Sequence, residues 1–246
     1  MRFGRIETAA GERHDVRFVD GVARASDREW PLADVRILPP VEPGKLIYVG
    51  MNYRDHAAEL NAPVPQEPLL FFKPRTALIS HEQAVVRPPG TTQLEYEGEL
   101  AVVIGSRCRN VAEADAAGVI AGYTIANDIT ARDWQRLDSQ WTKAKSWDTF
   151  APIGPWIETE LDPRDVAITT VVNGRKRQQG STRHLIFGVP ELVAYASRVM
   201  TLEPGDVIST GTPPGVGPLE VGDAVEVTVD GIGTLRNVIV TEPAEE

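Results

Sequence analysis

The chain has 246 residues, of which 42% are hydrophobic and 24% are charged. This composition is typical of a folded protein of one or two domains and excludes a disordered chain. Lys and Arg number 25 against 35 Asp and Glu, so the net charge is −10. Nucleic acids and anionic membrane surfaces attract basic proteins, so neither is an expected partner.

Cysteine content and apolar run length limit the remaining classes. Cys108 is the only cysteine, which excludes an intrachain disulfide and a cysteine-based zinc site. The sequence begins with no charged and apolar leader, and no apolar run approaches the ~20 residues of a membrane span. We therefore expect a soluble, intracellular protein of the cytoplasm.

The first part of the chain has a strand-like pattern. Apolar and polar residues alternate in two stretches separated by Asp20-Gly21, a pair that favours a hairpin because both turn positions need positive φ. Prolines at positions 39, 40 and 43 then end the pattern. We predict a small N-terminal β unit over residues 1–42 and a second, catalytic domain over residues 43–246.

Most of the second domain also has a strand pattern. Short apolar runs bounded by Gly, Pro or polar residues predict buried strands at residues 46–50, 69–73, 98–105, 121–126, 165–172, 206–209, 224–229 and 233–241. Helical patterns cover residues 53–60, 111–118, 127–137 and 189–200. Turns rather than helices connect most strands, so we predict a mainly β (α+β) fold with antiparallel or mixed sheets and peripheral helices.

Glu95, Glu97 and Glu99 alternate within a predicted strand and should share one face of it. Alternating glutamates commonly mark a solvated face. Here apolar residues fill both faces from Leu100 onward, which is typical of a strand buried on both sides. Carboxylates at the beginning of such a buried strand repel one another unless a cation neutralises them. This pattern favours a metal site.

Asp128 follows the apolar strand at residues 121–126. It is either the N-cap of a helix or a third carboxylate of the same site. Hard cations prefer oxygen ligands. Because the chain has neither cysteine pairs nor paired histidines, Mg²⁺ or Mn²⁺ fits it better than zinc.

His56 and Glu59 lie three residues apart in a predicted helix and should be neighbours on one face. A carboxylate beside a histidine fixes its tautomer and raises its basicity, as in a general base. A surface contact is the alternative. The prolines and polar residues nearby suggest a segment that orders on ligand binding.

Two further segments carry candidate ligand groups. Lys143 and Lys145 lie between Trp141 and Trp147, where a lysine either packs along apolar surface or binds a carboxylate in an apolar-walled site. The glycines of residues 209–217 either admit an anion to backbone N–H groups or form an ordinary turn. No motif supports a role for the other histidines, at positions 14, 81 and 184, and we expect them to be structural or at the surface.

Together these motifs resemble the fumarylacetoacetate hydrolase family from residue 46 to the C-terminus. The matching strings are GMNYRDHAAEL (50–60), FFKPRTAL (71–78), YEGELAVVIG (96–105), NDITARDWQ (127–135), AKSWDTFAPIGPW (144–156) and STGTPPGVGPL (209–219). The resemblance implies a β-roll of mixed sheets that forms a homodimer. It also implies that Glu97, Glu99 and Asp128 are the metal ligands, with Glu95 just outside the motif.

The same resemblance implies the other roles in the site. It makes Lys145 the active-site lysine and His56–Glu59 the catalytic dyad of the family's shorter members. The positions implied to bind substrate are Arg132, Gln135, Gly211 and Thr212. Arg75 departs from the small polar residue expected there, and either touches substrate or lies at the surface.

Shorter family members act on small 2-oxo acids through an enolate, which can lose CO₂, shift a proton or undergo carbon–carbon cleavage. They include acylpyruvate hydrolases, oxaloacetate decarboxylases or tautomerases, and the 2-hydroxyhepta-2,4-diene-1,7-dioate isomerase of aromatic catabolism. We expect an isomerase or decarboxylase of a small 2-oxo dicarboxylate that uses Mg²⁺, with Mn²⁺ as a substitute. Acylpyruvate-type hydrolysis is the second expectation, and an inactive binding or scaffold protein is the alternative of another class.

Overall fold

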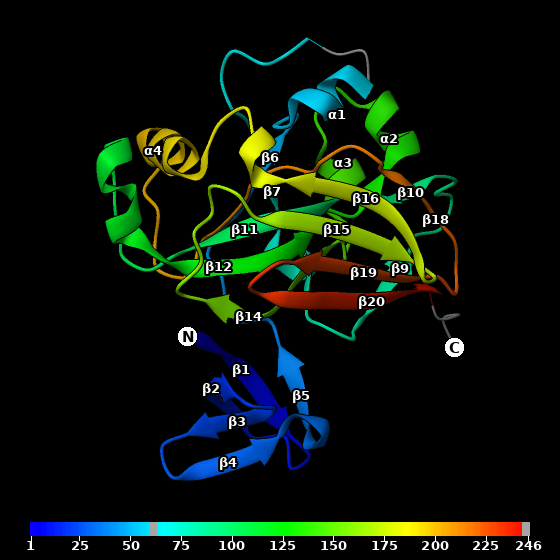
Figure 1. The fold of residues 1–246 in the computed structure, drawn as a ribbon. Coiled ribbons are helices and arrows are strands. Elements are labelled where there is room, and N and C mark those ends of the chain that lie inside the picture. Colours follow the sequence, from blue (N-terminus) through cyan, green and yellow to red (C-terminus); the bar gives the residue numbers. More distant parts are fainter. Residues whose placement is uncertain (60–62, 243–246) are drawn as a thin grey trace.

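Three β-sheets form the framework of the structure, a computed structural model that describes residues 1–59 and 63–242 (Figure 1). The largest sheet has 12 strands: β1 (Arg2–Thr8), β2 (Arg13–Val19), β3 (Val22–Ala25), β4 (Arg28–Pro31), β5 (Val35–Leu38), β6 (Leu46–Gly50), β7 (Leu69–Lys73), β8 (Leu78–Ile79), β11 (Gly98–Ile104), β12 (Ile120–Asn127), β14 (Ala151–Glu158) and β17 (Val207–Ser209). Its main path runs β4-β3-β2-β1-β14-β12-β11-β17-β6-β7.

The two smaller sheets complete the body. One consists of β9 (Ala84–Arg87), β15 (Ala167–Val172), β16 (Arg175–Ser181), β19 (Ala224–Val229) and β20 (Gly233–Thr241), and the other of β10 (Leu94–Tyr96), β13 (Thr130–Ala131) and β18 (Gly217–Leu219). The pairs β17–β6, β14–β8 and β20–β9 are parallel and the other strand pairs of the described residues are antiparallel, so the sheets are mixed. The predicted mainly β class is confirmed.

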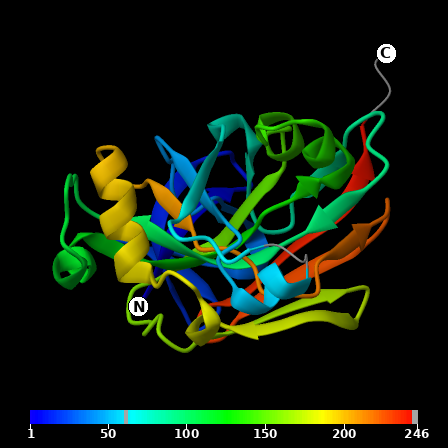
Figure 2. The same ribbon diagram turned by 90° about the horizontal axis from the view of Figure 1, so that it is seen from above.

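Helices are short and peripheral. They are α1 (Arg54–Glu59), α2 (Arg132–Leu137), α3 (Thr142–Lys145) and α4 (Val189–Val199), with 3₁₀ turns η1 (Leu32–Asp34), η2 (Arg75–Ala77), η3 (Glu113–Val119) and η4 (Thr182–His184). Figure 2 shows α4 well away from α1 and α2. Within residues 1–59 and 63–242, no helix is both long and apolar enough to cross a membrane.

The N-terminal strands β1–β5 lie at the end of the molecule opposite α1 and α2 (Figure 1). They enclose a small core of their own, made by Ile6, Val16, Phe18 and Ala23. Strand β1 also pairs with β14, so these strands continue the large sheet. The domain division at residue 42 stays a prediction.

Strand β11 lies at the centre of the body and is buried on both faces, as its sequence predicts. Leu100, Val102 and Ile104 belong to one hydrophobic cluster, whereas Ala101 and Val103 belong to another on the opposite face. Such a strand can lie only between packed layers, because both of its faces are apolar. The polar residues at its beginning are therefore held at the edge of the core.

Several predicted boundaries were wrong. The strand expected through the glutamates breaks at Glu97, because β10 and β11 belong to different sheets. The helix expected from residue 127 begins at Arg132, since β12 continues to Asn127. Strand β14 was missed because its prolines and glycine look like breakers, yet tertiary pairing holds it between β1 and β12. Leu60, predicted to end the first helix of the body, lies outside the described residues.

Candidate active site

Glu97, Glu99 and Asp128 come together as the resemblance implied. All three are buried, and one oxygen atom of each lies within 4.8 Å of the others. The antiparallel pairing of β11 with β12 causes this, because Gly98 lies opposite Asn127 and the N–H of Asp128 donates to the carbonyl oxygen of Glu97 (2.8 Å). The end of β12 therefore lies beside the beginning of β11.

Two glycines permit this close packing. A Cβ atom at Gly98 would lie 2.4 Å from Oγ1 of Thr170, so a side chain between Glu97 and Glu99 would clash with β15. Gly211 has φ +96° and approaches Asn52, where a Cβ atom would lie 2.8 Å from that of the asparagine. The Gly211 N–H donates to Oε2 of Glu99 (2.9 Å), to which the Ser209 hydroxyl also donates.

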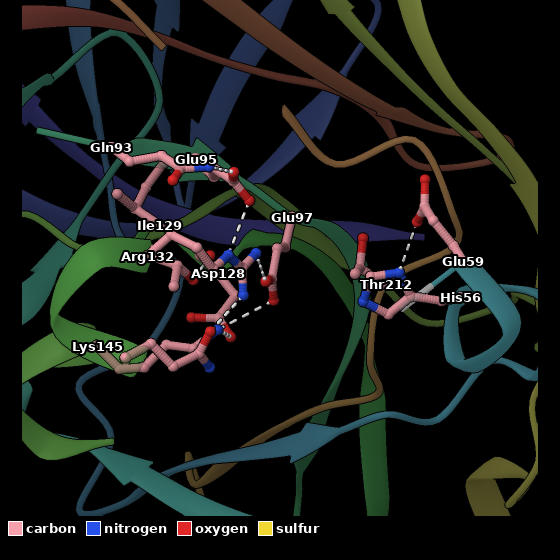
Figure 3. Close-up of polar contacts among 12 residues, drawn as sticks. His56, Glu59, Gln93, Glu95, Glu97, Asp128, Ile129, Arg132, Lys145 and Thr212 are labelled. Atoms are coloured by element: carbon pink, nitrogen blue, oxygen red, sulfur yellow. Dashed lines mark hydrogen bonds and ion pairs between the residues drawn. The ribbon is translucent and has the colours of Figure 1, made fainter. Parts of the chain in front are cut away.

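Two lysines contact the carboxylate of Asp128, and Figure 3 shows one of them, Lys145, pointing toward it. Lys145, at the end of α3, donates to Oδ2 of Asp128 (2.6 Å) and to Oε2 of Glu97 (3.0 Å). Lys73, from the end of β7, lies 2.5 Å from the other oxygen, Oδ1. It also donates to the carbonyl oxygens of Ile129 (2.9 Å) and Phe150 (2.5 Å). Lys73 was not identified as a site residue from the sequence. A lysine at the end of an apolar strand could have indicated a buried charge.

These contacts shift the pKa values of Glu97 and Glu99 in opposite directions. Burial alone would raise the pKa of Glu97, but the positive charges of Lys145 and Arg132 outweigh it and hold that pKa well below its usual range. Burial and the negative charges of Asp128 and Glu97 raise the pKa of Glu99 well above its usual range. Burial also lowers the pKa of Lys73 to about 8, against the opposing effect of Asp128.

Arg132 is bound by carboxylates on two sides. Its Nη2 donates to Oε1 of Glu97 (2.6 Å), its Nε to Oε2 of Glu95 (2.8 Å) and its Nη1 to Oε1 of Gln135 (2.5 Å). Glu95 therefore pairs with Arg132 and lies outside the group of three carboxylates. Arg132 and Gln135 line the cavity described below, and their contact with substrate stays a prediction.

His56 and Glu59 form the contact that their spacing predicts. Nδ1 of the buried His56 lies 3.0 Å from Oε2 of Glu59, whose carboxylate also accepts the Gly215 N–H (3.1 Å). Asn52, which sequence reasoning missed, fixes the start of this segment: its side chain bonds the carbonyl oxygens of Phe187 and Thr210 and the Phe187 N–H. Helix α1 is thus tied to the glycine loop.

One cavity of about 270 Å³ joins these groups. Its polar lining includes His56, Glu97, Glu99, Lys145 and Thr212, and its apolar lining includes Val49, Met51, Phe71 and Trp141. The hydroxyl of Thr212 is oriented by the Gly98 carbonyl oxygen (3.0 Å) and by Nε2 of Gln178 (2.7 Å). A volume of this size suits a small molecule.

Other candidates lie elsewhere. Lys143 stacks over the Trp134 ring at 3.4 Å and lines a separate cavity, so the two lysines of its segment point to different sites. Arg75 lines another cavity beside the N-terminal strands, together with Arg5 and Arg36. That location separates Arg75 from the carboxylates.

The donor set fits a hard divalent cation. All three groups are carboxylates, and their oxygens are close enough to share one ion. No cysteine takes part, since Cys108 lies against the core packed by α4. A divalent cation would also offset the charge repulsion that disfavours ionised Glu99.

Comparison with known proteins gives a consistent result. A family model described as fumarylacetoacetate (FAA) hydrolase C-terminal matches residues 45–240. The solved 5-carboxymethyl-2-hydroxymuconate delta-isomerase from Mycobacterium smegmatis is 49% identical, with a TM-score of 0.93 over 99% of this chain and 100% of that one.

Two other solved structures are similar. The 2-hydroxyhepta-2,4-diene-1,7-dioate isomerase from Mycobacterium marinum is 42% identical, with a TM-score of 0.89 over 98% of this chain and 99% of that one. The maleylpyruvate hydrolase from Sphingobium, in complex with manganese (II) ion and pyruvate, is 30% identical. Its TM-score is 0.85 over 99% of this chain and 100% of that one. The named relatives are thus isomerases and a hydrolase.

Proposed function

Because this chain belongs to the fumarylacetoacetate hydrolase family, we propose that it is a Mg²⁺-dependent enzyme that acts on small 2-oxo dicarboxylic acids through an enolate. The reaction is an isomerisation, as named for the two mycobacterial relatives, or a decarboxylation through the same enolate. The observation that supports this most is the cavity lined by Glu97, Glu99, Lys145 and His56. Asp128 and Glu59 lie directly behind that lining, in contact with Lys145 and His56.

Glu97, Glu99 and Asp128 would hold the cation, which is Mg²⁺ or, as in the Sphingobium complex, Mn²⁺. When bound, such a cation supplies Lewis-acid polarisation of a carbonyl oxygen. The remaining roles belong to side chains of the chain itself, and their geometry is already set by hydrogen bonds within the protein.

Lys145 supplies a fixed positive charge inside the cavity. Burial lowers its pKa, but Asp128 and Glu97 outweigh that effect and raise the pKa above its usual range, so the ammonium keeps its charge. A charged group held in place stabilises negative charge as it develops on a substrate oxygen. Thr212 lines the same cavity, and its hydroxyl would bind a substrate carboxylate by turning its proton away from the Gly98 carbonyl oxygen.

His56 would move the proton. Because Glu59 occupies Nδ1, Nε2 is the nitrogen left for the substrate. In isomerisation, this nitrogen would take a proton from one substrate carbon and deliver it to another. In decarboxylation, the bond to CO₂ breaks with its electron pair left in the enolate, and this nitrogen would deliver to that carbon a proton taken up from water. Hydrolysis of a carbon–carbon bond is the second candidate, favoured by similarity to the maleylpyruvate hydrolase; there His56 would activate water.

The test is an NMR assay that detects decarboxylation, tautomerisation and cleavage together. Oxaloacetate, acetylpyruvate and 2-hydroxyhepta-2,4-diene-1,7-dioate are supplied with Mg²⁺ or EDTA. We expect turnover of a dicarboxylate, loss of turnover in EDTA, and a loss of roughly a hundredfold or more in His56→Gln. His184→Gln, an exposed histidine, is the matched control.

Two results would contradict the proposal. Turnover that persists in EDTA would exclude the metal role, and near-normal turnover by His56→Gln would exclude the base. Calorimetry with oxalate distinguishes an inactive binding protein, which would show no Mg²⁺-dependent binding. The homodimer and the cytoplasmic location stay predictions, and light scattering after size exclusion measures the first.

A further inference from the structure

Arg136 is a cationic group of the catalytic cavity that the roles above do not use. It lies on α2 and lines the same cavity as Glu97, Lys145 and His56. Its side chain is exposed, which places it at the cavity mouth. Within residues 1–59 and 63–242, no ion pair or side-chain hydrogen bond engages its guanidinium.

The other strong cations of the cavity are already occupied. Arg132 uses three nitrogens on Glu95, Glu97 and Gln135, and breaking these bonds would leave buried carboxylates unpaired. Lys145 is shared between Glu97 and Asp128. Arg136 is therefore the cavity cation whose donors are available to a ligand without loss of an existing ion pair.

The helix sets the position of Arg136 relative to the inner groups. Residues four apart share a helix face, so Arg132 and Arg136 lie on the same side of α2. The helical rise separates them by about 6 Å along the axis. Since Arg132 contacts Glu97 at the inner end, a substrate whose 2-oxo acid end reaches the carboxylates would have its far end near Arg136.

The chemistry of a guanidinium identifies the group that it would bind. Arginine presents parallel N–H donors that match a carboxylate in a bidentate pair. We propose that Arg136 receives the distal carboxylate of the substrate and so selects 2-oxo dicarboxylates over 2-oxo acids with an uncharged tail. This inference rests on the proposed function and narrows its substrate class.

The test compares two ligands of equal chain length, 2-oxoadipate and 2-oxohexanoate, which differ by the distal carboxylate. Calorimetry in Mg²⁺ measures their affinities for the wild type, Arg136→Met and Arg136→Lys. We expect the wild type to prefer 2-oxoadipate by about tenfold, the gain expected for a charge-assisted hydrogen bond. Arg136→Met should lose that preference and leave 2-oxohexanoate binding within about twofold. Arg136→Lys should retain part of it.

Arg175→Met is the matched control, because it removes the same charge from an exposed hairpin position outside the cavity. It should keep the full preference. Equal weakening of both ligands in Arg136→Met, or no preference in the wild type, would overturn the proposal. Turnover is measured separately: a preference without turnover refutes the proposed reaction and leaves the role of Arg136 intact, whereas turnover without a preference refutes Arg136 alone.

Discussion

Lys73 and Asp128 form an ion pair inside the protein, with Nζ of Lys73 2.5 Å from Oδ1 of Asp128 and neither side chain more than 2% exposed. The second oxygen of Asp128 faces Lys145 at 2.6 Å. Removing one partner of a buried pair leaves an uncompensated charge, which is far more costly than losing a surface pair. The carboxylate of Asp128 thus depends on two charges that are themselves almost completely buried.

Replacing Lys73 with methionine should therefore destabilise the protein by roughly 3–5 kcal/mol. The change removes the charge beside Asp128 and leaves the carbonyl oxygens of Ile129 and Phe150 without their donor. Urea unfolding measures the effect. Lys143→Met, at an exposed lysine over Trp134, should lower stability by less than about 1 kcal/mol. An equal loss in both variants would contradict the prediction.

Glu99→Gln should weaken metal binding and yet stabilise the metal-free protein at neutral pH. A carboxyl group whose pKa is raised on folding stabilises the fold below its unfolded pKa, and this contribution is lost as pH rises through the folded pKa. The side-chain amide of the Glu99→Gln variant is neutral at every pH, so the variant does not lose stability in this way. Titration with Mn²⁺ followed by electron paramagnetic resonance should show roughly tenfold weaker binding or more, and urea unfolding in EDTA should show the higher stability.

Glu95→Gln is the matched control for the same chemical change, because Glu95 pairs with Arg132 outside the group of three carboxylates. It should keep Mn²⁺ affinity within about threefold. If Glu95→Gln weakened Mn²⁺ binding as strongly as Glu99→Gln, the assignment of the ligands would be wrong.

Gly98→Ala should disturb the carboxylates through packing alone. The new methyl group would lie 2.4 Å from Oγ1 of Thr170 and 2.9 Å from Cγ1 of Val227, so β11 must move away from the five-stranded sheet. We expect a loss of about 1–3 kcal/mol in stability together with weaker Mn²⁺ binding. Adding Thr170→Ala to Gly98→Ala should restore part of the stability and part of the Mn²⁺ affinity. If the double variant were no better than Gly98→Ala in either quantity, the packing explanation would be wrong.

His81 should make stability depend on pH near neutrality. Burial lowers its pKa, and Nδ1 accepts the backbone N–H of Arg236 (3.0 Å), which requires the neutral ring. The unfolded chain then binds the proton more readily, so stability should fall as pH drops below about 6.5, the ordinary pKa. Urea unfolding between pH 7.5 and 5.5 should show a shallower dependence in His81→Gln, and no change in slope for the exposed His184→Gln.

Features that depend on near neighbours in the chain could be predicted from the amino-acid sequence. The apolar run after Glu99 predicted a strand buried on both faces, because alternation and its absence are local properties. The His56–Glu59 contact followed from helical spacing in the same way. The resemblance added the grouping of Glu97 and Glu99 with Asp128, which spacing alone only suggested.

Only the tertiary structure decided which distant groups share the site. Lys73 meets Asp128 although β11, β17 and β6 lie between β7 and β12 in the sheet, and nothing near Lys73 in sequence marks that partner. Arg132 and Arg136 look alike in sequence, yet one is bound by carboxylates and the other is available at the cavity mouth. Ion pairs and cavities depend on distances through space, which strand order and packing set and local periodicity does not.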